Sequence, residues 1–171
     1  HIEQVGYDTY CKLLDEVIKT MQGIEVQEEK DVQIDINVSS YIPDEYIDNS
    51  SQKIEIYQNI ALCRTEEDIQ NVIDEIIDRY GVMPEELENL IEIARIKELC
   101  RKENVVKISQ KRDRILFYYN KDKMDMSKID GLIKKYELRI KFSTGIEPYI
   151  TLQLENSNDK ELIEQIKEFL R

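Results

Sequence analysis

The sequence predicts an α+β fold, within the broad α/β class, in which a helix-rich first half packs on a small, mostly antiparallel sheet with its own helices. Two observations support this prediction. Apolar residues recur at three- and four-residue steps through most of residues 1–103, and short alternating stretches interleave with two helical patterns in residues 104–171. With only five glycines and three prolines in 171 residues, the composition is that of an ordered protein.

The first half opens with a helical pattern and continues with a strand. Six apolar residues at helical spacing predict an amphipathic helix that ends near Gly23: Tyr10, Leu13, Leu14, Val17, Ile18 and Met21. Residues 31–38, DVQIDINV, alternate strictly between apolar and polar side chains and predict a strand. Pro43 then restricts its predecessor to extended backbone, which predicts a turn.

Three further helices are predicted before residue 103. Ser50 or Ser51 can cap the first, which carries Ile54, Tyr57, Ile60 and Ala61 on one side. Thr65 and Asp68 resemble a capping box that opens the second, and Gly81 is suited to close it. Its expected inward residues are Ile69, Val72, Ile73, Ile76, Ile77 and Tyr80. Pro84 begins the third helix, which runs to about Lys102 and is apolar around most of its circumference.

The second half reads as strand, strand, helix, strand, strand, helix. VVKIS and RILFYYN predict two strands joined through QKRD, and residues 126–136 predict a helix. LRIKF and YITLQLE alternate like strands, and Asn158 or Asp159 can cap the last helix.

The chain lacks the residue patterns that the common catalytic and cofactor sites need. His1 is the only histidine, and no glycine-rich phosphate loop occurs. Cys11, Cys63 and Cys100 are far apart and suit small core residues, so we expect no metal site and no disulfide. We therefore predict no cofactor and no enzymatic activity for this chain by itself. An enzyme with an unfamiliar acidic site is the weaker alternative.

Charge is distributed unevenly along the chain. Residues 1–103 carry 25 acidic and 10 basic residues, whereas residues 104–171 carry 11 and 14. The acidic half favours a basic partner and opposes binding to nucleic acid. The mildly basic second half leaves an accessory nucleic-acid-binding domain as an alternative. No apolar run is long enough to span a bilayer, so we expect no membrane association and a cytoplasmic protein.

One polar ridge on the predicted 65–80 helix is a candidate partner-binding surface. Glu75, Asp78 and Arg79 are three or four residues apart, so they share a helix face, which we expect to lie opposite the apolar stripe. Glu75 and Arg79 can pair with each other. Asp78 lies at the negative end of the helix dipole, an unfavourable position that an external cation would relieve. A solvated helix end is the alternative interpretation.

Three segments in order resemble the carboxyl-terminal part of the bacterial transcription-repair coupling factors. HIEQVGYDTYCKLL resembles the end of the translocase module of that family, and DINVSSYIPDEYI resembles the start of its last domain. IIDRYGVMPEELENLIEIARIK is similar to the family's most recognisable segment. The resemblance covers residues 1 to about 103. Tyr80 departs from the phenylalanine common in the family, and IDN after Tyr46 departs from a common proline.

The resemblance implies a domain division and a function. Residues 1–24 would be a trailing helix of the translocase, and residues 25–171 one non-catalytic regulatory domain. That domain would pack on the UvrB-like amino-terminal module of the same protein, mask the UvrA-binding surface and restrain the motor. Glu75, Asp78 and Arg79 would face arginines of that module. The parent protein would bind RNA polymerase, UvrA and DNA, and would move along DNA at the expense of ATP. We expect no nucleic-acid binding by the isolated domain.

Overall fold

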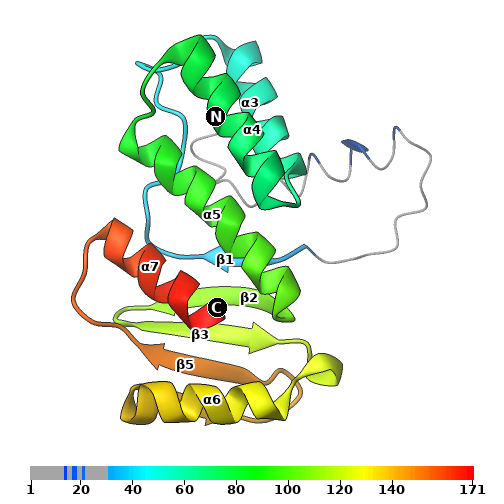
Figure 1. Cartoon of the computed structure of the whole chain (residues 1–171), viewed down its shortest axis with the longest axis vertical. Coiled ribbons are helices and arrows are strands. Elements are labelled where there is room, and N and C mark those ends of the chain that lie inside the picture. Colours follow the sequence, from blue (N-terminus) through cyan, green and yellow to red (C-terminus); the bar gives the residue numbers. More distant parts are fainter. Residues whose placement is uncertain (1–13, 15–16, 19–20, 22–30) are drawn as a thin grey trace. The chain divides into compact units, whose positions relative to one another are not determined.

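The computed structural model describes residues 14, 17–18, 21 and 31–171, and the chain divides into two compact units (Figure 1). Unit 1 comprises His1–Asp31 and Ser39–Arg95, and unit 2 comprises Val32–Val38 and Ile96–Arg171. Helix α5 (Glu85–Lys102) contributes its first part to unit 1 and its end to unit 2. The described residues contain five α-helices and one five-stranded mixed sheet, which confirms the α+β prediction.

The predicted first helix falls mostly outside the described residues. Leu14, Val17, Ile18 and Met21 are described, and all four have helical conformation. Val17 and Met21 are 53% and 82% exposed, so the predicted burial is wrong at these two positions. The proposed boundary between residues 1–24 and 25–171 stays a prediction.

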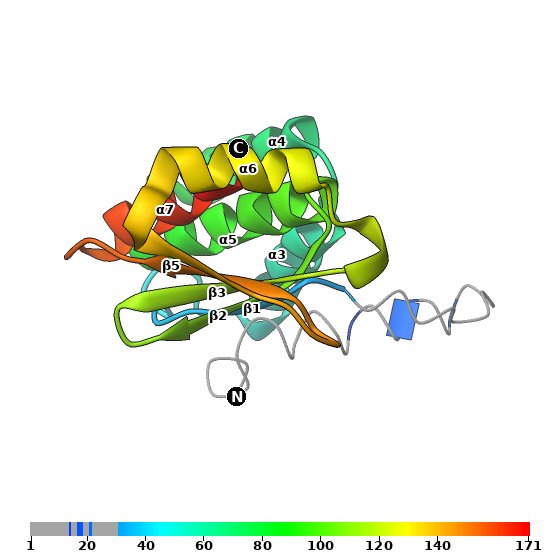
Figure 2. The same ribbon diagram turned by 90° about the horizontal axis from the view of Figure 1, so that it is seen from below.

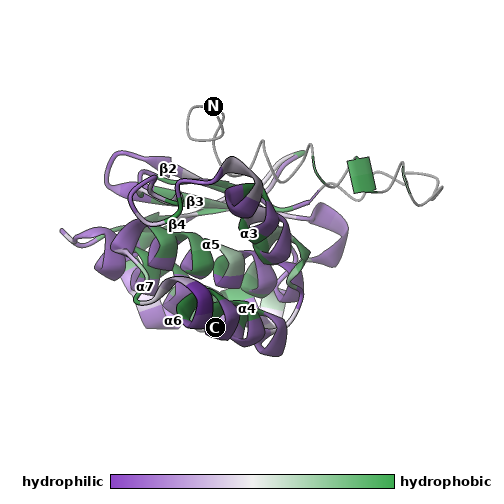
Figure 3. Ribbon diagram, turned by 90° about the horizontal axis from the view of Figure 1, so that it is seen from above, coloured by the Kyte–Doolittle hydropathy of each residue, from purple (hydrophilic) through white to green (hydrophobic). Residues whose placement is uncertain are grey.

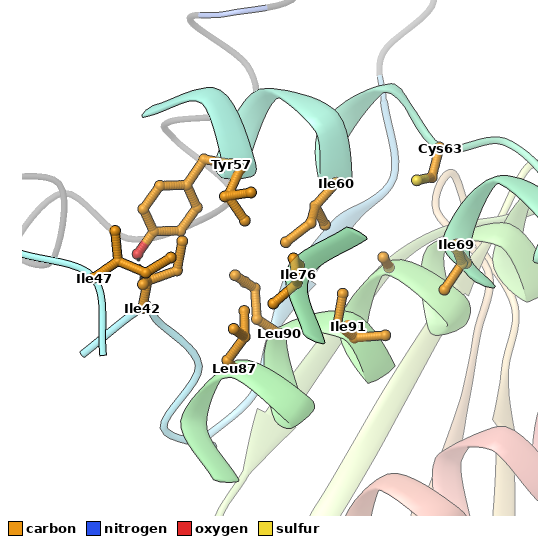
Figure 4. Close-up of a cluster of buried hydrophobic side chains, with 12 residues drawn as sticks. Ile42, Ile47, Tyr57, Ile60, Cys63, Ile69, Ile76, Leu87, Leu90 and Ile91 are labelled. Carbon is orange, nitrogen blue, oxygen red and sulfur yellow. Dashed lines mark hydrogen bonds between the residues drawn. The ribbon is translucent and has the colours of Figure 1, made fainter. Parts of the chain in front are cut away.

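Unit 1 is built from α3 (Ser50–Leu62), α4 (Glu66–Tyr80) and the first part of α5. Their buried side chains, with Ile42 and Ile47 of the preceding segment, form the cluster drawn in Figure 4. The cap of α3 is Asn49 and not a serine, because its side chain accepts a hydrogen bond from the backbone N–H of Gln52. Ile54 is 37% exposed, contrary to the prediction, whereas Ile56 is fully buried.

The segment before α3 is tied to the helices by hydrogen bonds. The backbone N–H of Ile42 donates to the Tyr57 hydroxyl at 2.9 Å, inside the cluster shown in Figure 4. The Asn89 side-chain amide donates to the carbonyl of Ser39 at 2.9 Å. These bonds satisfy polar groups that would otherwise be costly to bury, so they fix this loop on the helices.

Unit 2 is a sheet of strand order β1-β2-β3-β5-β4. Only β1 runs parallel to its neighbour, so the sheet is mostly antiparallel as predicted. Helices α6 (Met126–Tyr136) and α7 (Asp159–Leu170) lie over one face of it (Figure 2). Asn158 caps α7 by accepting from the backbone N–H of Glu161. The strands are β1 (Gln33–Asp35), β2 (Val105–Lys111), β3 (Arg114–Tyr119), β4 (Ile140–Ser143) and β5 (Tyr149–Gln153).

Two predicted strand features differ in the structure. The 31–38 strand is reduced to three residues, although the alternation holds, since Val32 and Ile34 are buried and Gln33 and Asp35 are exposed. The hairpin between β2 and β3 has a shorter loop than expected, because β2 extends to Lys111. A two-residue loop favours positive φ, and Arg112 has a φ of 59°.

Candidate functional site

Helix α4 carries the predicted ridge, and its two ends form as the local sequence requires. The backbone N–H of Asp68 donates to the Thr65 hydroxyl at 3.1 Å, and the N–H of Thr65 donates to the Asp68 carboxylate at 3.2 Å. This is the predicted capping box. Gly81 has a φ of 85°, a conformation that disfavours residues with a side chain, and ends the helix. Green and purple bands along α4 in Figure 3 show its amphipathic character.

The capping box should make the stability of the protein depend on pH through Asp68. The backbone N–H of Arg64 donates to the Asp68 carboxylate at 3.0 Å and, with the bonds from Thr65, holds the pKa of Asp68 below its ordinary value of 3.8. A lowered folded-state pKa contributes stability that is present above the unfolded-state pKa and is lost as pH falls through the folded-state pKa. Wild type should therefore melt above Asp68→Asn at neutral pH, and the difference should shrink below pH about 4. Thermal melts at pH 7 and pH 3 test this, and a gap that is constant with pH would contradict it.

The three ridge residues are all exposed, but they differ in their contacts. The Arg79 guanidinium lies 3.5 Å from the Glu75 carboxylate, which confirms that predicted pair. It also lies 3.6 Å from the carboxylate of Glu55 on α3 and over the ring of Tyr80. Among the described residues, Asp78 makes no ion pair. Arg79 is thus on the flank of α4 that faces α3, and not directly opposite the buried stripe.

Exposed apolar side chains lie at the same end of α4 and were not expected there. Ile77 is 46% exposed, although the periodicity placed it inward, and Val82 in the following turn is 87% exposed. Protein interfaces combine apolar residues with a polar and charged rim. The carboxyl end of α4 therefore has the mixed character of a protein-binding surface: Glu75, Ile77, Asp78 and Val82. The position of Ile77 at the margin of the apolar stripe was the sequence feature that could have indicated its exposure.

Contacts within unit 1 hold this end of α4 in place. The Tyr46 hydroxyl donates to the carbonyl of Gly81 at 2.6 Å, and its ring lies 6.0 Å from that of Tyr80. Burial, together with Tyr80, raises the pKa of Tyr46, so its hydroxyl stays a donor at neutral pH. The surface is therefore presented by a fixed helix end and not by a free terminus.

At the opposite end of α4, Arg95 joins that helix to α5. Its guanidinium donates to the Glu66 carboxylate at 3.0 Å and also pairs with Glu92. Burial opposes the charge of Arg95, but the two carboxylates outweigh it and raise its pKa. The sequence did not indicate that Arg95 connects the two helices, because Glu66 is 29 residues away along the chain.

The described residues offer little chemistry beyond this surface. Burial raises the pKa of the Cys63 thiol to about 11, and it raises the pKa of the buried Cys100 as well, so both thiols are protonated and unreactive at neutral pH. These two confirm the predicted core cysteines, and Cys11 lies outside the described residues. Within the described part of the chain, no group of three acidic, histidine or cysteine side chains is arranged to hold a metal ion. The helices described there include none with the length and apolar character to cross a membrane.

A model of the TRCF domain family matches residues 36–129, which is more than half of the chain. The chain belongs to the TRCF domain family. It is 30% identical over 96% of its length to the transcription-repair-coupling factor of Borreliella burgdorferi, and 34% identical over 80% to that of Bacillus subtilis. It covers 15% and 12% of those two proteins, respectively, so it corresponds to a small part of each relative.

A solved structure supports the same assignment of fold. The crystal structure of a C-terminal domain of transcription-repair coupling factor superposes with a TM-score of 0.73 at 22% identity. The match covers 81% of this chain and 89% of that one. The family match begins at Ile36, within the predicted 31–38 strand, and extends into α6, so this TRCF domain matches beyond residue 103, where the sequence resemblance ended.

Proposed function

We propose that this TRCF domain is a non-catalytic regulatory domain that works as a releasable intramolecular clamp. In the parent coupling factor it would pack on the UvrB-like amino-terminal module, mask the UvrA-binding surface and restrain the DNA translocase until RNA polymerase is engaged. The parent would be a cytoplasmic protein, since its partners act on the bacterial chromosome. Family membership and the names of the relatives support a role between transcription and repair.

The observation that carries the proposal is the carboxyl end of α4. There the Asp78 carboxylate is exposed and has no ion pair within the described residues, beside exposed Ile77 and Val82. Unit 1 as a whole carries 22 acidic and 7 basic residues. A basic partner surface would be attracted over a distance and then held by short contacts. Such an interface is salt-sensitive and reversible, as a clamp requires.

The first test reverses the ridge charges. Close charge pairs across an interface can couple by about 1.5–7 kcal/mol, and a loss of about 3 kcal/mol opens a clamp that is about 99% closed. Full-length parent protein with Glu75→Lys and Asp78→Lys should therefore bind UvrA without RNA polymerase or DNA and show raised basal ATPase activity. A UvrA pull-down measures the first effect and a steady-state ATPase assay the second.

The matched control applies the same charge change in unit 2. Asp130 and Glu147 are exposed and make no ion pair within the described residues, so Asp130→Lys with Glu147→Lys should leave UvrA masked. Arg79→Ala should open the clamp less than the double reversal, because Arg79 is already engaged by Glu55 and Glu75. If the ridge variant melts like wild type yet captures no UvrA, the ridge is a solvated face and the clamp contact lies elsewhere.

A further inference from the structure

The face of the sheet opposite α6 and α7 carries a pair of tyrosines. The rings of Tyr118 on β3 and Tyr149 on β5 are 5.2 Å apart, and the two residues are directly paired in the sheet. The Lys107 ammonium on β2 lies 5.4 Å from the centre of the Tyr118 ring. We call this side of the sheet the tyrosine face. Its opposite side contains Phe117, which is fully buried and stacked on Phe169 of α7.

Cations gather on the tyrosine face without carboxylate partners among the described residues. Residues two apart along a strand share a face, as do directly paired residues. This places four basic side chains, the face cations, on the same side as the tyrosine pair: Lys107, Lys111, Arg114 and Lys141. None of the four makes an ion pair within the described residues. Asp35 of β1, paired with Ser109, is the one carboxylate among the described strand residues of this face.

The charge of unit 2 agrees with this local picture. Unit 2 carries 17 basic and 14 acidic residues, whereas unit 1 carries 7 and 22. The expectation that the isolated domain avoids nucleic acid came from the acidic first half, and the chain's net charge of −12 averages over two units of opposite sign. The tyrosine face is therefore a local exception to the acidic character of the chain.

Half-buried tyrosine rings beside cations that lack carboxylate partners within the described residues match the chemistry that single-stranded nucleic acid requires. Bases stack on aromatic rings, and Lys and Arg contact the phosphates. Lys107 gains a cation–π contact with Tyr118, but within the described residues Lys111, Arg114 and Lys141 have no carboxylate partner, and like charges in proximity repel. Thr151, which is half-buried, adds a hydroxyl group on the same face.

We propose that the tyrosine face binds single-stranded nucleic acid, with bases stacked on the tyrosine pair and phosphates held by the face cations. Stacking on an aromatic side chain tolerates any base, so binding should depend little on sequence. Duplex should bind more weakly, because its bases are already stacked on one another. This binding is independent of the clamp, which uses unit 1.

The test is fluorescence anisotropy of the 171-residue chain with labelled 15-nucleotide dT and U strands and a 15-base-pair duplex at 50 mM salt. Single strands should bind more tightly than duplex. With about three phosphate contacts, raising the salt fourfold should weaken binding about 15–20-fold. Tyr118→Ala with Tyr149→Ala should weaken it at least about fivefold, and Tyr118→Phe with Tyr149→Phe should restore it. The Phe pair also controls for folding, since it keeps the rings.

Charge controls separate this site from general attraction. Lys107→Ala with Arg114→Ala should weaken binding, whereas Lys121→Ala with Lys134→Ala, two exposed lysines outside the face, should not. The proposal is overturned if the wild type binds no single strand or binds duplex as tightly as single strands. It is also overturned if the double variant within the face and the double variant outside it lose the same amount of affinity. Binding of a poly-glutamate peptide in competition with dT, unaffected by loss of the tyrosines, would instead identify a site for an acidic protein.

Discussion

Phe117→Ala is expected to lower the free energy of unfolding by about 3–5 kcal/mol. Phe117 is fully buried in unit 2, and its ring stacks on that of Phe169 with 4.0 Å between centres. Truncation removes this contact and leaves a cavity between the sheet and α7, which the regular backbone of β3 cannot collapse to fill. Urea denaturation followed by circular dichroism measures the loss.

The neighbouring residue provides the control for Phe117. Leu116 is half-buried on the opposite face of the same strand, so Leu116→Ala should cost clearly less than Phe117→Ala. Equal losses of unfolding free energy at the two positions would contradict the more complete burial of the Phe117 face of β3.

Ile76→Ala is expected to lower the free energy of unfolding by about 2–5 kcal/mol, and Ile77→Ala by less than about 1 kcal/mol. The two isoleucines are adjacent on α4, yet Ile76 is fully buried in the unit 1 cluster (Figure 4), whereas Ile77 is 46% exposed. The substitution is chemically identical and alanine favours the helix at both positions, so the difference isolates burial. Parallel urea titrations give it directly.

A second measurement separates stability from partner binding at Ile77. If the exposed end of α4 is the clamp interface, Ile77→Asp in the full-length parent should unmask UvrA while the isolated domain keeps its melting temperature. Large destabilisation of the isolated domain by Ile77→Asp would show that Ile77 belongs to the core, as the periodicity first suggested.

Local sequence determined the elements whose ends depend on nearby residues. Thr65 with Asp68 and the glycine at 81 set both ends of α4, because a cap needs only atoms three or four residues away. RILFYYN likewise predicted a strand, and any strand puts neighbours such as Phe117 and Tyr118 on opposite faces, because side chains alternate along it. The candidate ridge was likewise visible, because helical spacing alone brings Glu75 and Arg79 together.

Tertiary structure decided everything that depends on residues far apart in the sequence. The pairing of β1 with β2 is an example. Ile34 lies beside Ile108, and no local sequence pattern encodes a partner so distant. The position of α3 determines which flank of α4 is covered. Ile76 is therefore buried while Ile77 is exposed, and Arg79 lies beside Glu55. Tertiary structure also brought Tyr149 beside Tyr118 and gathered Lys141 with Lys111 on one face. The sequence supplies side chains at regular intervals, but only the pairing of strands determines which of them meet.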